Sequence, residues 1–439
     1  MITYIRMQNF KSWRDSGNVP LAPLTGFFGT NSSGKSSLLQ MLLLLKQTAE
    51  CSNIDKVIFW GDNTSLVNLG SFREVIHRHL FQSSLGFEFA CKLTHPRPLY
   101  EIPEDGSPWQ QTIDRFAFDS LIQVENGKLV VKKLMYGHSP KGVAEIVWEE
   151  GKASFPNQHI NKYEMELETC YGILSQGTSE TGKFLRKFSS AFEELFSHVY
   201  YLGPTRVHPR RLYHWEKTHP KEIDVWGNEA VDALLSARVR QLTTAHNGKK
   251  VSIEERISKW LQKMELAHSF SLAPQGSLDD NNYEICIQKT QNSSEVTLAD
   301  MGHGVADLFP LLVHCCYVPE GSTLILEQPG IHLHPKAQAD LADLLIEAIT
   351  ERNLQILIES HSEHLLTRLQ LRIAEGKIPV SETALYFCEN ENGVSSIKPL
   401  DIDELGNIKN WPKNFFGDVR GDLVKMTREQ TKRQKKAEG

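Results

Sequence analysis

The segment from Gly29 to Ser36 has the residue types and spacing of a phosphate-binding loop. It fits the pattern glycine, four residues, glycine, lysine, and then serine or threonine. Glycines let the backbone close around phosphate groups, and N–H groups at the start of the next helix attract anionic oxygens. We expect Lys35 to reach the β- and γ-phosphates and the Ser36 hydroxyl to ligate Mg²⁺. The sequence therefore predicts binding of ATP with Mg²⁺ through Gly29, Thr30, Asn31, Ser32, Ser33, Gly34, Lys35, Ser36 and Ser37.

The stretches on either side of this loop predict the elements that must position it. Gly26 to Phe28 is apolar and predicts the end of a buried strand, and the leucine-rich stretch from Ser37 to Thr48 predicts a helix. A glycine-serine turn that binds no nucleotide would also match part of the pattern, but it would need neither a strand before it nor a helix after it. Strand, loop and helix in this order favour nucleotide binding over a turn.

A second candidate for phosphate chemistry lies far along the chain, at Glu327. Leu324 to Leu326 predicts a short buried strand that ends in this acid. A carboxylate at such a strand end orients Mg²⁺ and its waters, so we expect Ser36 and Glu327 to hold the metal. The long separation from Lys35 argues against ring-forming hexameric ATPases, which place this strand soon after the loop.

The order of further motifs resembles the ATP-binding-cassette (ABC) head found in transporters, SMC proteins, RecF and OLD-family proteins. The segment from Leu298 to Asp307 lies where such heads carry a glycine-rich signature, and Leu308 to Val318 is apolar enough for the helix that follows it. Leu354 to Ile358 predicts a strand, after which His361 is similar to the switch histidine of these heads. The resemblance implies a dimer with ATP between two heads. The nucleotide would be contacted in trans by the signature residues Asp300, Gly302 and Gly304.

A closer resemblance extends over almost the whole chain. Bacterial OLD-like ATPases of anti-phage defence systems carry segments similar to Asn9–Ser12, Leu69–Phe72, Leu202–Arg206, His332–Pro335 and Asn410–Phe416. The ATPase subunits of the Septu and PARIS systems are similar in style. The resemblance implies a homodimer or higher oligomer that acts as ATP-dependent sensor or scaffold for a separate effector, a nuclease or toxin. It leaves nucleic acid as a further candidate partner and implies no membrane partner.

Gln328 departs from the pattern of these heads, in which a second glutamate orients or deprotonates the attacking water. An amide cannot act as a general base, although glutamine positions water in some GTPases. We therefore expect Gln328 and His361 to be the catalytic residues, with His361 as a sensor of the γ-phosphate. Hydrolysis is expected to be slow and the ATP-bound dimer long-lived. The alternative is that Glu359 or Glu363 supplies the base.

The predicted fold class is α/β, a P-loop NTPase head of ABC/SMC type that is split by a long insertion. Short alternating runs after Leu85 predict a β-rich part, and the patterns at Gly182–Ser197, Glu229–Leu242 and Ile253–Leu266 predict a helical part. We place the N-terminal part of the head at residues 1–84 and the insertion at 85–280. The C-terminal part of the head occupies 281–400, and a family-specific basic tail occupies 401–439.

Several residue groups leave alternatives open. His332 and His334 fit a dimer-contact loop better than a metal site. The basic and aromatic stretch from Arg206 to Trp215 fits two alternatives. It could bind nucleic acid through phosphate contacts and stacking, or an arginine in it could connect the insertion to the head. The tail cations fit a partner contact or a solvated helix: Lys425, Arg428, Lys432, Arg433, Lys435 and Lys436. Asp401 and Asp403 resemble the aspartate pair of a TOPRIM nuclease, but too little chain follows them, so we expect no intrinsic nuclease.

Composition narrows the function classes. The chain has 439 residues and a formal charge of −6, which gives no general case for nucleic-acid binding. It lacks a membrane-length apolar run and a signal-peptide pattern, so we expect a cytoplasmic protein. Its seven cysteines have no disulfide-framework or zinc spacing, which predicts buried thiols. The alternative function is a RecF-like DNA-repair ATPase, favoured by the basic stretch at Arg206–Arg211. A transporter ATPase is disfavoured by the long insertion and the tail.

Overall fold

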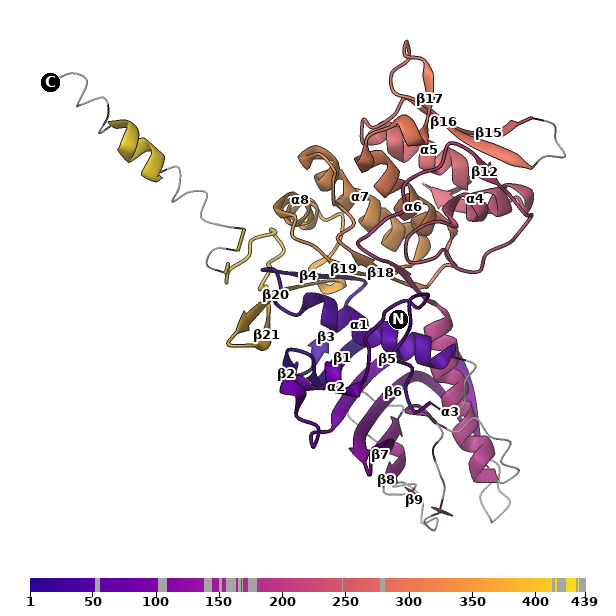
Figure 1. Ribbon diagram of the computed structural model, residues 1–439, viewed down its shortest axis with the longest axis vertical. Helices are drawn as coiled ribbons and strands as arrows, with labels where there is room; N and C mark the ends of the chain where they lie inside the picture. Colours follow the sequence, from indigo (N-terminus) through magenta and orange to yellow (C-terminus); the bar gives the residue numbers. More distant parts are fainter. Residues whose placement is uncertain are drawn as a thin grey trace.

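The computed structural model has two lobes on either side of a central sheet (Figure 1). It describes residues 1–51, 56–101, 109–137, 144–149, 152–154, 163–164, 167, 169–172, 180–246, 248–276, 281–412, 415–416, 424–431 and 433. Parts of the predicted insertion and tail therefore lie outside the described residues, among them Lys413, Asn414, Lys432, Lys435 and Lys436.

The central sheet carries the phosphate loop. Its strands, in spatial order, are β11 (Val199–Leu202), β18 (Thr323–Glu327), β19 (Gln355–Glu359), β4 (Leu24–Gly29), β20 (Thr383–Glu391) and β21 (Val394–Pro399). The first five run parallel, and β21 returns antiparallel to β20. Since parallel strands end at one edge of a sheet, the residues that follow β4, β18 and β19 are brought together there.

Alternate residues of the central strands enter two different apolar cores. Phe28 of β4 and Ile358 of β19 belong to the core of the upper lobe, whereas Phe27 and Leu357 belong to the core of the lower lobe. Successive side chains of a strand point to opposite faces, so a sheet covered on both faces needs continuous apolar strands. Every residue of β18 and β19 is buried. Both strands nevertheless end in a glutamate, which packing alone does not explain.

The lower lobe consists of helices packed on an antiparallel sheet (Figure 1). The sheet is ordered β10, β9, β8, β7, β6, β5, β1, β2, with β3 beside β1. Phe192 of the long helix α3 packs on Phe89 and Phe118 of the sheet, at ring distances of 5.8 and 5.0 Å. The elements of this lobe are β1 (Ile2–Phe10), β2 (Trp13–Asp15), β3 (Val19–Pro20), α1 (Lys35–Ala49), α2 (Phe72–Val75), η1 (His77–His79), β5 (Leu85–Glu101), β6 (Trp109–Glu125), β7 (Lys128–Gly137), β8 (Ala144–Glu149), β9 (Lys152–Ser154), β10 (Tyr163–Glu164) and α3 (Glu180–Ser197).

The upper lobe is mainly helical, with two small antiparallel sheets. Its central helix α6 is buried from Val305 to Cys316 except at Asp307, and it packs against α4, α5 and α7. The elements are β12 (Tyr213–His214), α4 (Ala230–Val239), β13 (Thr243–His246), β14 (Lys249–Ser252), α5 (Ile253–Lys263), β15 (Ser269–Gln275), β16 (Asn282–Gln288), β17 (Glu295–Thr297), η3 (Leu298–Asp300), α6 (His303–Tyr317), α7 (Pro335–Arg352), α8 (Glu363–Ala374) and η4 (Val380–Glu382).

The structure confirms the predicted α/β class and the elements around the phosphate loop. The strand, loop and helix order is that of β4, the loop and α1, and the three helical patterns of the insertion correspond to α3, α4 and α5. Two features of the predicted insertion reach into the head. Strand β5 pairs with β1, and β11 forms the edge of the central sheet next to β18. Local periodicity identifies such strands but does not reveal their partners, so the boundaries at 84/85 and 280/281 stay predictions.

The central sheet predicts a strong and localised effect of truncating one of its side chains. Leu357 is fully buried on β19, and Leu357→Ala should lower the free energy of unfolding by about 2–5 kcal/mol, because it leaves a cavity. Urea unfolding followed by tryptophan fluorescence measures this. The matched control is Leu371→Ala on α8, where the side chain is 46% exposed, and the expected change is within about 0.5 kcal/mol. Equal losses for both variants would contradict the assigned core.

Candidate functional site

The phosphate loop needs glycine at both of its ends. Gly29 has a φ of +140°, and a Cβ there would lie 2.1 Å from the Cys388 carbonyl oxygen. Gly34 has a φ of +91°, and a Cβ there would lie 2.5 Å from the Ser395 hydroxyl and 2.7 Å from Trp13 Nε1. Any other residue would strain the backbone and collide with these neighbours. The loop conformation is therefore set by the glycines and by contacts from β2, β20 and β21.

Trp13 and Ser395 hold the end of the loop from outside. Trp13 Nε1 donates a hydrogen bond to the Gly34 carbonyl at 3.0 Å. The Ser395 hydroxyl donates to the Ser12 hydroxyl at 2.6 Å, and its backbone N–H donates to the Ser12 carbonyl at 2.9 Å. These bonds connect β2 and β21 next to the first turn of α1, so the loop is supported by segments from both ends of the chain.

Lys35 is folded back onto its own loop. Its ammonium group is buried and donates to the Thr30 carbonyl at 2.7 Å, and to the Gly29 carbonyl and the Ser33 hydroxyl at 3.3 Å. Burial lowers the pKa of Lys35, and the negative charge of Glu359, 3.9 Å away, opposes that shift. Phosphate oxygens are stronger acceptors than these carbonyls. The lysine is thus in position to exchange carbonyl partners for a nucleotide.

Two buried carboxylates lie side by side next to this lysine. Glu327 and Glu359 are the last residues of β18 and β19 and are paired in register. Burial and, to a lesser extent, the charge of Glu359 raise the pKa of Glu327 to about 7, against a 3.0 Å hydrogen bond from the Tyr201 hydroxyl. Burial also raises the pKa of Glu359, against a hydrogen bond from Ser36 and the charge of Lys35. The pair therefore resists carrying two negative charges without a cation.

These donors fit a divalent cation. Mg²⁺ prefers oxygen ligands, and it commonly takes one or two carboxylates with phosphate oxygens and water as the rest. Ser36 and Glu327 meet that requirement, and the buried Oε2 atom of Glu359 has no hydrogen-bond partner within the described residues. Two buried carboxylates thus lie beside the first turn of α1, in which Ser36 follows Lys35.

Gln328 and His361 lie at the same edge of the sheet. Gln328 has a φ of +46°, and its N–H donates to the Glu359 carbonyl at 2.9 Å, which fixes the turn after β18. A left-handed glutamine is a strained conformation of the kind that clusters at functional sites. Desolvation against the cleft wall lowers the pKa of His361, and the charge of Lys35 lowers it further. His361 is therefore a neutral imidazole at neutral pH.

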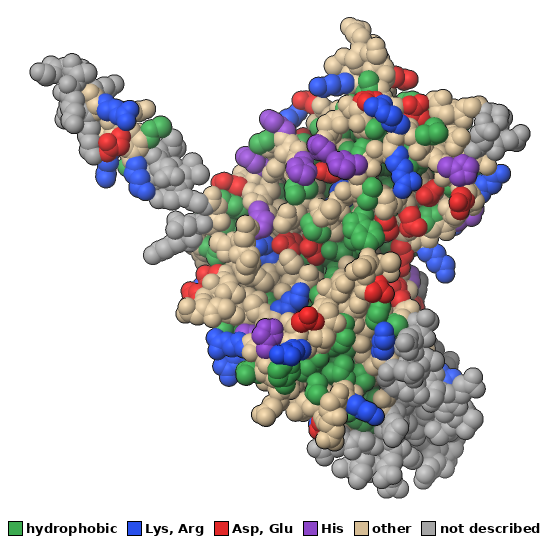
Figure 2. Space-filling view, in the orientation of Figure 1, with side chains coloured by type: hydrophobic (Ala, Val, Ile, Leu, Met, Phe, Trp, Pro, Cys, Tyr) green, Lys and Arg blue, Asp and Glu red, His purple; other side chains and the backbone are tan. Residues whose placement is uncertain are grey.

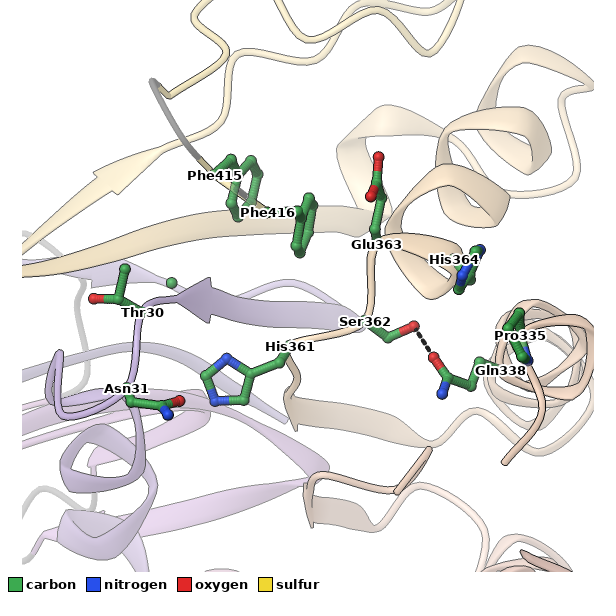
Figure 3. Close-up of a pocket in the computed structure, with 11 residues that line it drawn as sticks. Thr30, Asn31, Pro335, Gln338, His361, Ser362, Glu363, His364, Phe415 and Phe416 are labelled. Carbon is green, nitrogen blue, oxygen red and sulfur yellow. Dashed lines mark hydrogen bonds between the residues drawn. The ribbon is translucent and has the colours of Figure 1, made fainter. Parts of the chain in front are cut away.

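A cleft of about 730 Å³ opens beside the loop (Figure 3). Its wall combines the loop, the segment after β19, the start of α7 and the tail. In Figure 3, His361 points toward Asn31, and the rings of Phe415 and Phe416 stand over the opposite side. The lining residues are Gly29, Thr30, Asn31, Pro335, Gln338, His361, Ser362, Glu363, His364, Phe415 and Phe416.

The remaining loop residues are distributed around Lys35 and the first turn of α1. Ser32 is exposed with a φ of +58°, and Ser33 is buried. Ser37 is buried, and its N–H donates to the Gly34 carbonyl at 3.1 Å. The predicted nucleotide-binding residues from Gly29 to Ser37 thus form one continuous segment, in which some side chains are exposed and others are buried.

The predicted signature residues do not line the cleft of their own chain. Gly302 is exposed at the start of α6, with nothing within 4 Å of a Cβ built there, whereas a Cβ on Gly304 would lie 2.8 Å from the His332 carbonyl oxygen. Asp300 is paired with Arg211, with N–O distances of 2.7 and 2.6 Å. Asp300 therefore has a partner within its own chain, while Gly302 is exposed at a helix start with open space around it.

The arginine stretch divides into an inward and an outward part. Burial lowers the pKa of Arg206 to about 10, while the charges of Asp307 and Glu327 raise it. Its Nε and Nη1 atoms are buried without a hydrogen-bond partner in the described part of the chain. Arg206 thus faces the head, as in the alternative of an arginine tie. Figure 2 shows basic and acidic side chains interspersed on the drawn face, with no continuous basic surface there.

The other metal candidates have structural roles. His332 contacts the Asp307 carboxylate at 2.7 Å, and His334 Nδ1 accepts the N–H of Lys336 at the start of α7. Asp403 accepts the N–H groups of Leu405 and Asn407, which closes a turn. Among the residues that the structure describes, no group of three or more His, Cys, Asp or Glu side chains is arranged to hold a metal ion.

Several parts of the site were missed from the sequence. Tyr201 bonds to Glu327 from the edge strand β11, Trp13 holds the loop, and Phe415 and Phe416 line the cleft. The sequence indicates Glu359 only as an alternative base. Its place as the last residue of a strand, two residues before His361, was the one available signal.

In the chain segments with described structure, no helix has the length and apolar character needed to span a membrane.

The chain is similar to known families over most of its length. A family model described as an AAA ATPase domain matches residues 1–197 and 227–366. A second model, described as a protein of unknown function (DUF3696), matches residues 378–426. The search of curated proteins found no match.

Similar solved structures include heads of SMC proteins. One is an Smc head bound to the C-terminal winged-helix domain of ScpA, with 12% identity, coverage of 91% of this chain and 98% of that one, and a TM-score of 0.46. The SMC head domain from Thermotoga maritima also has 12% identity, with coverage of 91% and 99% and a TM-score of 0.42. A third is an Smc head domain with an extended coiled coil, bound to the C-terminal domain of ScpA derived from Pyrococcus furiosus. Its identity is 12%, its coverage 91% and 96%, and its TM-score 0.44.

The raised pKa of Glu327 predicts pH-dependent stability of the protein without nucleotide or metal. The pKa of this carboxyl is about 7 in the folded protein, against an ordinary value of 4.5, so the folded state binds the extra proton between these pH values. Stability should therefore fall as the pH rises from 4.5 to 7, by on the order of 1–3 kcal/mol. Glu327→Gln removes this loss. In EDTA its melting temperature should exceed that of the wild type above pH 7, with the difference shrinking toward pH 4.5.

The control for this measurement is Glu404→Gln, which changes an exposed carboxylate outside the cleft. As a surface substitution, it should change the free energy of unfolding by no more than about 0.5 kcal/mol. A pH-independent difference between Glu327→Gln and the wild type would show that Glu327 does not carry the shifted proton.

Proposed function

The chain belongs to the AAA ATPase domain family, and we propose that it is an ATP-dependent switch in which two chains close around Mg²⁺-bound ATP and hydrolyse it slowly. One observation carries the proposal. A complete phosphate loop adjoins two buried, paired carboxylates, Glu327 and Glu359, and Glu327 is followed by Gln328, an amide where a base would be needed.

The residues of one head have distinct proposed roles in binding. Lys35 releases the carbonyls of its loop and binds the β- and γ-phosphates, which keeps its buried charge paired. Asn31 and the neutral His361 lie close together in the cleft and contact the γ-phosphate. Ser36 and Glu327 hold Mg²⁺, which when bound neutralises charge on the phosphates. Their convergence on one sheet edge supports this assignment.

The second head supplies the other side of the nucleotide. Gly302 is exposed and capable of close approach, and N–H groups at the start of α6 favour an anion. We propose that this helix start, with Asp300 and Gly304, faces the phosphate loop of the partner subunit. The free energy of ATP binding is then coupled to dimerisation, because ATP prefers the closed state.

The slow rate follows from the chemistry of Gln328. Its side chain orients a water molecule by hydrogen bonds but cannot accept the proton, and His361 contributes as a sensor rather than a base. The ATP-bound dimer would consequently persist, which suits a sensor or scaffold better than a motor.

The biological setting that we propose is anti-phage defence with a separate effector, a nuclease or toxin. It is supported by the segments similar to OLD-like ATPases, among them Leu202–Arg206 and His332–Pro335. A phage plaque assay in cells that carry the gene with its neighbours tests this role. Protection that is lost with Lys35→Ala supports it, and protection that Lys35→Ala leaves intact contradicts it.

The competing function is an ATPase that acts directly on DNA. The inward position of Arg206 and the pairing of Arg211 with Asp300 weaken its main support. Titration of duplex and single-stranded DNA at several salt concentrations separates the two functions. Affinity that falls steeply with salt would favour direct action on DNA.

The switch predicts a particular result for turnover and particle mass measured on the same sample. For the wild type, ATP should convert monomer to dimer with turnover well below about 1 per second. Lys35→Ala should neither bind ATP nor dimerise. Gln328→Glu should raise turnover by about 100-fold, since a general base contributes factors of this size. Wild-type turnover of about 1–10³ per second that Gln328→Glu leaves unchanged would show that the base lies elsewhere.

Gly302 allows a direct test of contact in trans. Gly302→Asp fits the fold, because no atom lies within 4 Å of its Cβ and aspartate is a good helix N-cap. Its negative charge should repel the partner's triphosphate and abolish ATP-driven dimerisation, while ATP binding by the monomer is retained. Gly302→Asn is the neutral control of equal size and should dimerise better than Gly302→Asp. Equal dimerisation of both variants and the wild type would contradict the proposed interface.

A further inference from the structure

We propose that Glu359 is the second acid of the Mg²⁺ site, which orients the Ser36 hydroxyl and a metal-bound water from the strand next to Glu327. This inference rests on the proposed binding of Mg²⁺ and ATP and goes beyond it by assigning a residue that lies outside the phosphate loop and the acidic strand.

The strand register places the two acids together. Glu327 and Glu359 are paired residues of the parallel strands β18 and β19, and each ends its strand. Paired residues of adjacent strands project to the same face of a sheet. Both residues are almost fully buried, at 6% and 3% exposure. A sheet interior tolerates such a pair of acids only if cations or donors compensate both charges.

The surroundings of Glu359 connect it to the metal-binding serine. Burial raises the pKa of Glu359 and the nearby Ser36 hydroxyl opposes that shift, while Lys35 Nζ lies 3.9 Å from Oε1. The Oε2 atom is buried and has no hydrogen-bond partner among the described residues. When the Ser36 hydroxyl donates its proton to Glu359, its lone pairs point elsewhere and are available to a metal ion.

Nucleotide binding changes the charge balance around Glu359. In the structure, Lys35 is the cation that contacts this carboxylate. When the phosphates bind Lys35, part of that compensation is lost, and leaving a buried carboxylate unsatisfied is costly. An Mg²⁺ ion that arrives with the phosphates restores a positive charge, and one of its water ligands would donate to the unpartnered Oε2.

The same geometry accounts for the amide at Gln328. Heads of the type that this chain resembles place two acids in succession at the end of one strand. Here the second acid comes instead from the adjacent strand, so the site keeps two negative charges although position 328 is neutral. Glu359 lies on the metal side, next to Ser36, and acts as a positioning residue for the ion rather than as a replacement for the base.

Binding of Mn²⁺ tests this assignment without relying on turnover. Electron paramagnetic resonance measures the affinity for Mn²⁺ in the presence of a non-hydrolysable ATP analogue, and a fluorescent ATP derivative measures metal-free nucleotide affinity in EDTA. Glu359→Gln should weaken Mn²⁺ binding by about 10- to 100-fold, as loss of an outer-sphere partner does at other metal sites. Metal-free nucleotide affinity should stay unchanged, because Lys35 and the loop are intact.

Two further variants make the result decisive. Glu404→Gln, which changes an exposed carboxylate outside the cleft, should leave Mn²⁺ affinity unchanged. Glu359→Asp keeps the charge with a shorter reach and should bind Mn²⁺ more tightly than Glu359→Gln, and it replaces that variant if Glu359→Gln does not fold. Unchanged Mn²⁺ affinity in the Glu359 variants would overturn the inference, as would an equal loss of metal-free ATP binding. Failure of the wild type to bind the analogue with Mn²⁺ would instead overturn the proposed function itself.

Discussion

Parallel hydrogen bonding among β4, β19 and β18 is the constraint on which the site depends. In this register Glu359 pairs with both Phe27 and Glu327, so the phosphate loop, the buried lysine and two acids share one edge of the sheet. A shift of one residue in either pairing would move a glutamate side chain to the opposite face of the sheet, where it would enter an apolar core. Sheet register and site chemistry are therefore specified by the same backbone contacts.

Charge compensation connects this geometry to the nucleotide. Without ligand, Lys35 is held by backbone carbonyls, the pKa of Glu327 is raised to about 7, and Arg206 has buried donors without partners in the described structure. The Glu327 carboxylate and the Arg206 guanidinium are thus incompletely compensated without a ligand. Phosphates and Mg²⁺ carry the opposite charges, so their binding would relieve several costs at once. The site is thus prepared for an ion and its triphosphate together.

The tail and the upper lobe extend the site beyond the loop. Phe415 packs edge-on against Phe387 at 4.8 Å and stacks on Phe416 at 4.2 Å, so the segment near the end of the chain becomes part of the cleft wall. Gly302, at the start of α6, is exposed and does not line that cleft. This separation of loop and signature within one chain is what makes a second copy necessary in the proposed mechanism.

The sequence by itself determined the loop from Gly29 to Ser36, the buried strands before Glu327 and Glu359, and the helices beside them, because these depend on local spacing and apolar periodicity. Only the tertiary structure decided that β11 joins the central sheet, that Glu359 lies against Ser36, that Arg206 turns inward, and that Phe415 reaches the cleft. Those positions depend on pairing and packing between segments far apart in the chain. Local patterns show that a residue will be buried, but not which distant residue it will meet.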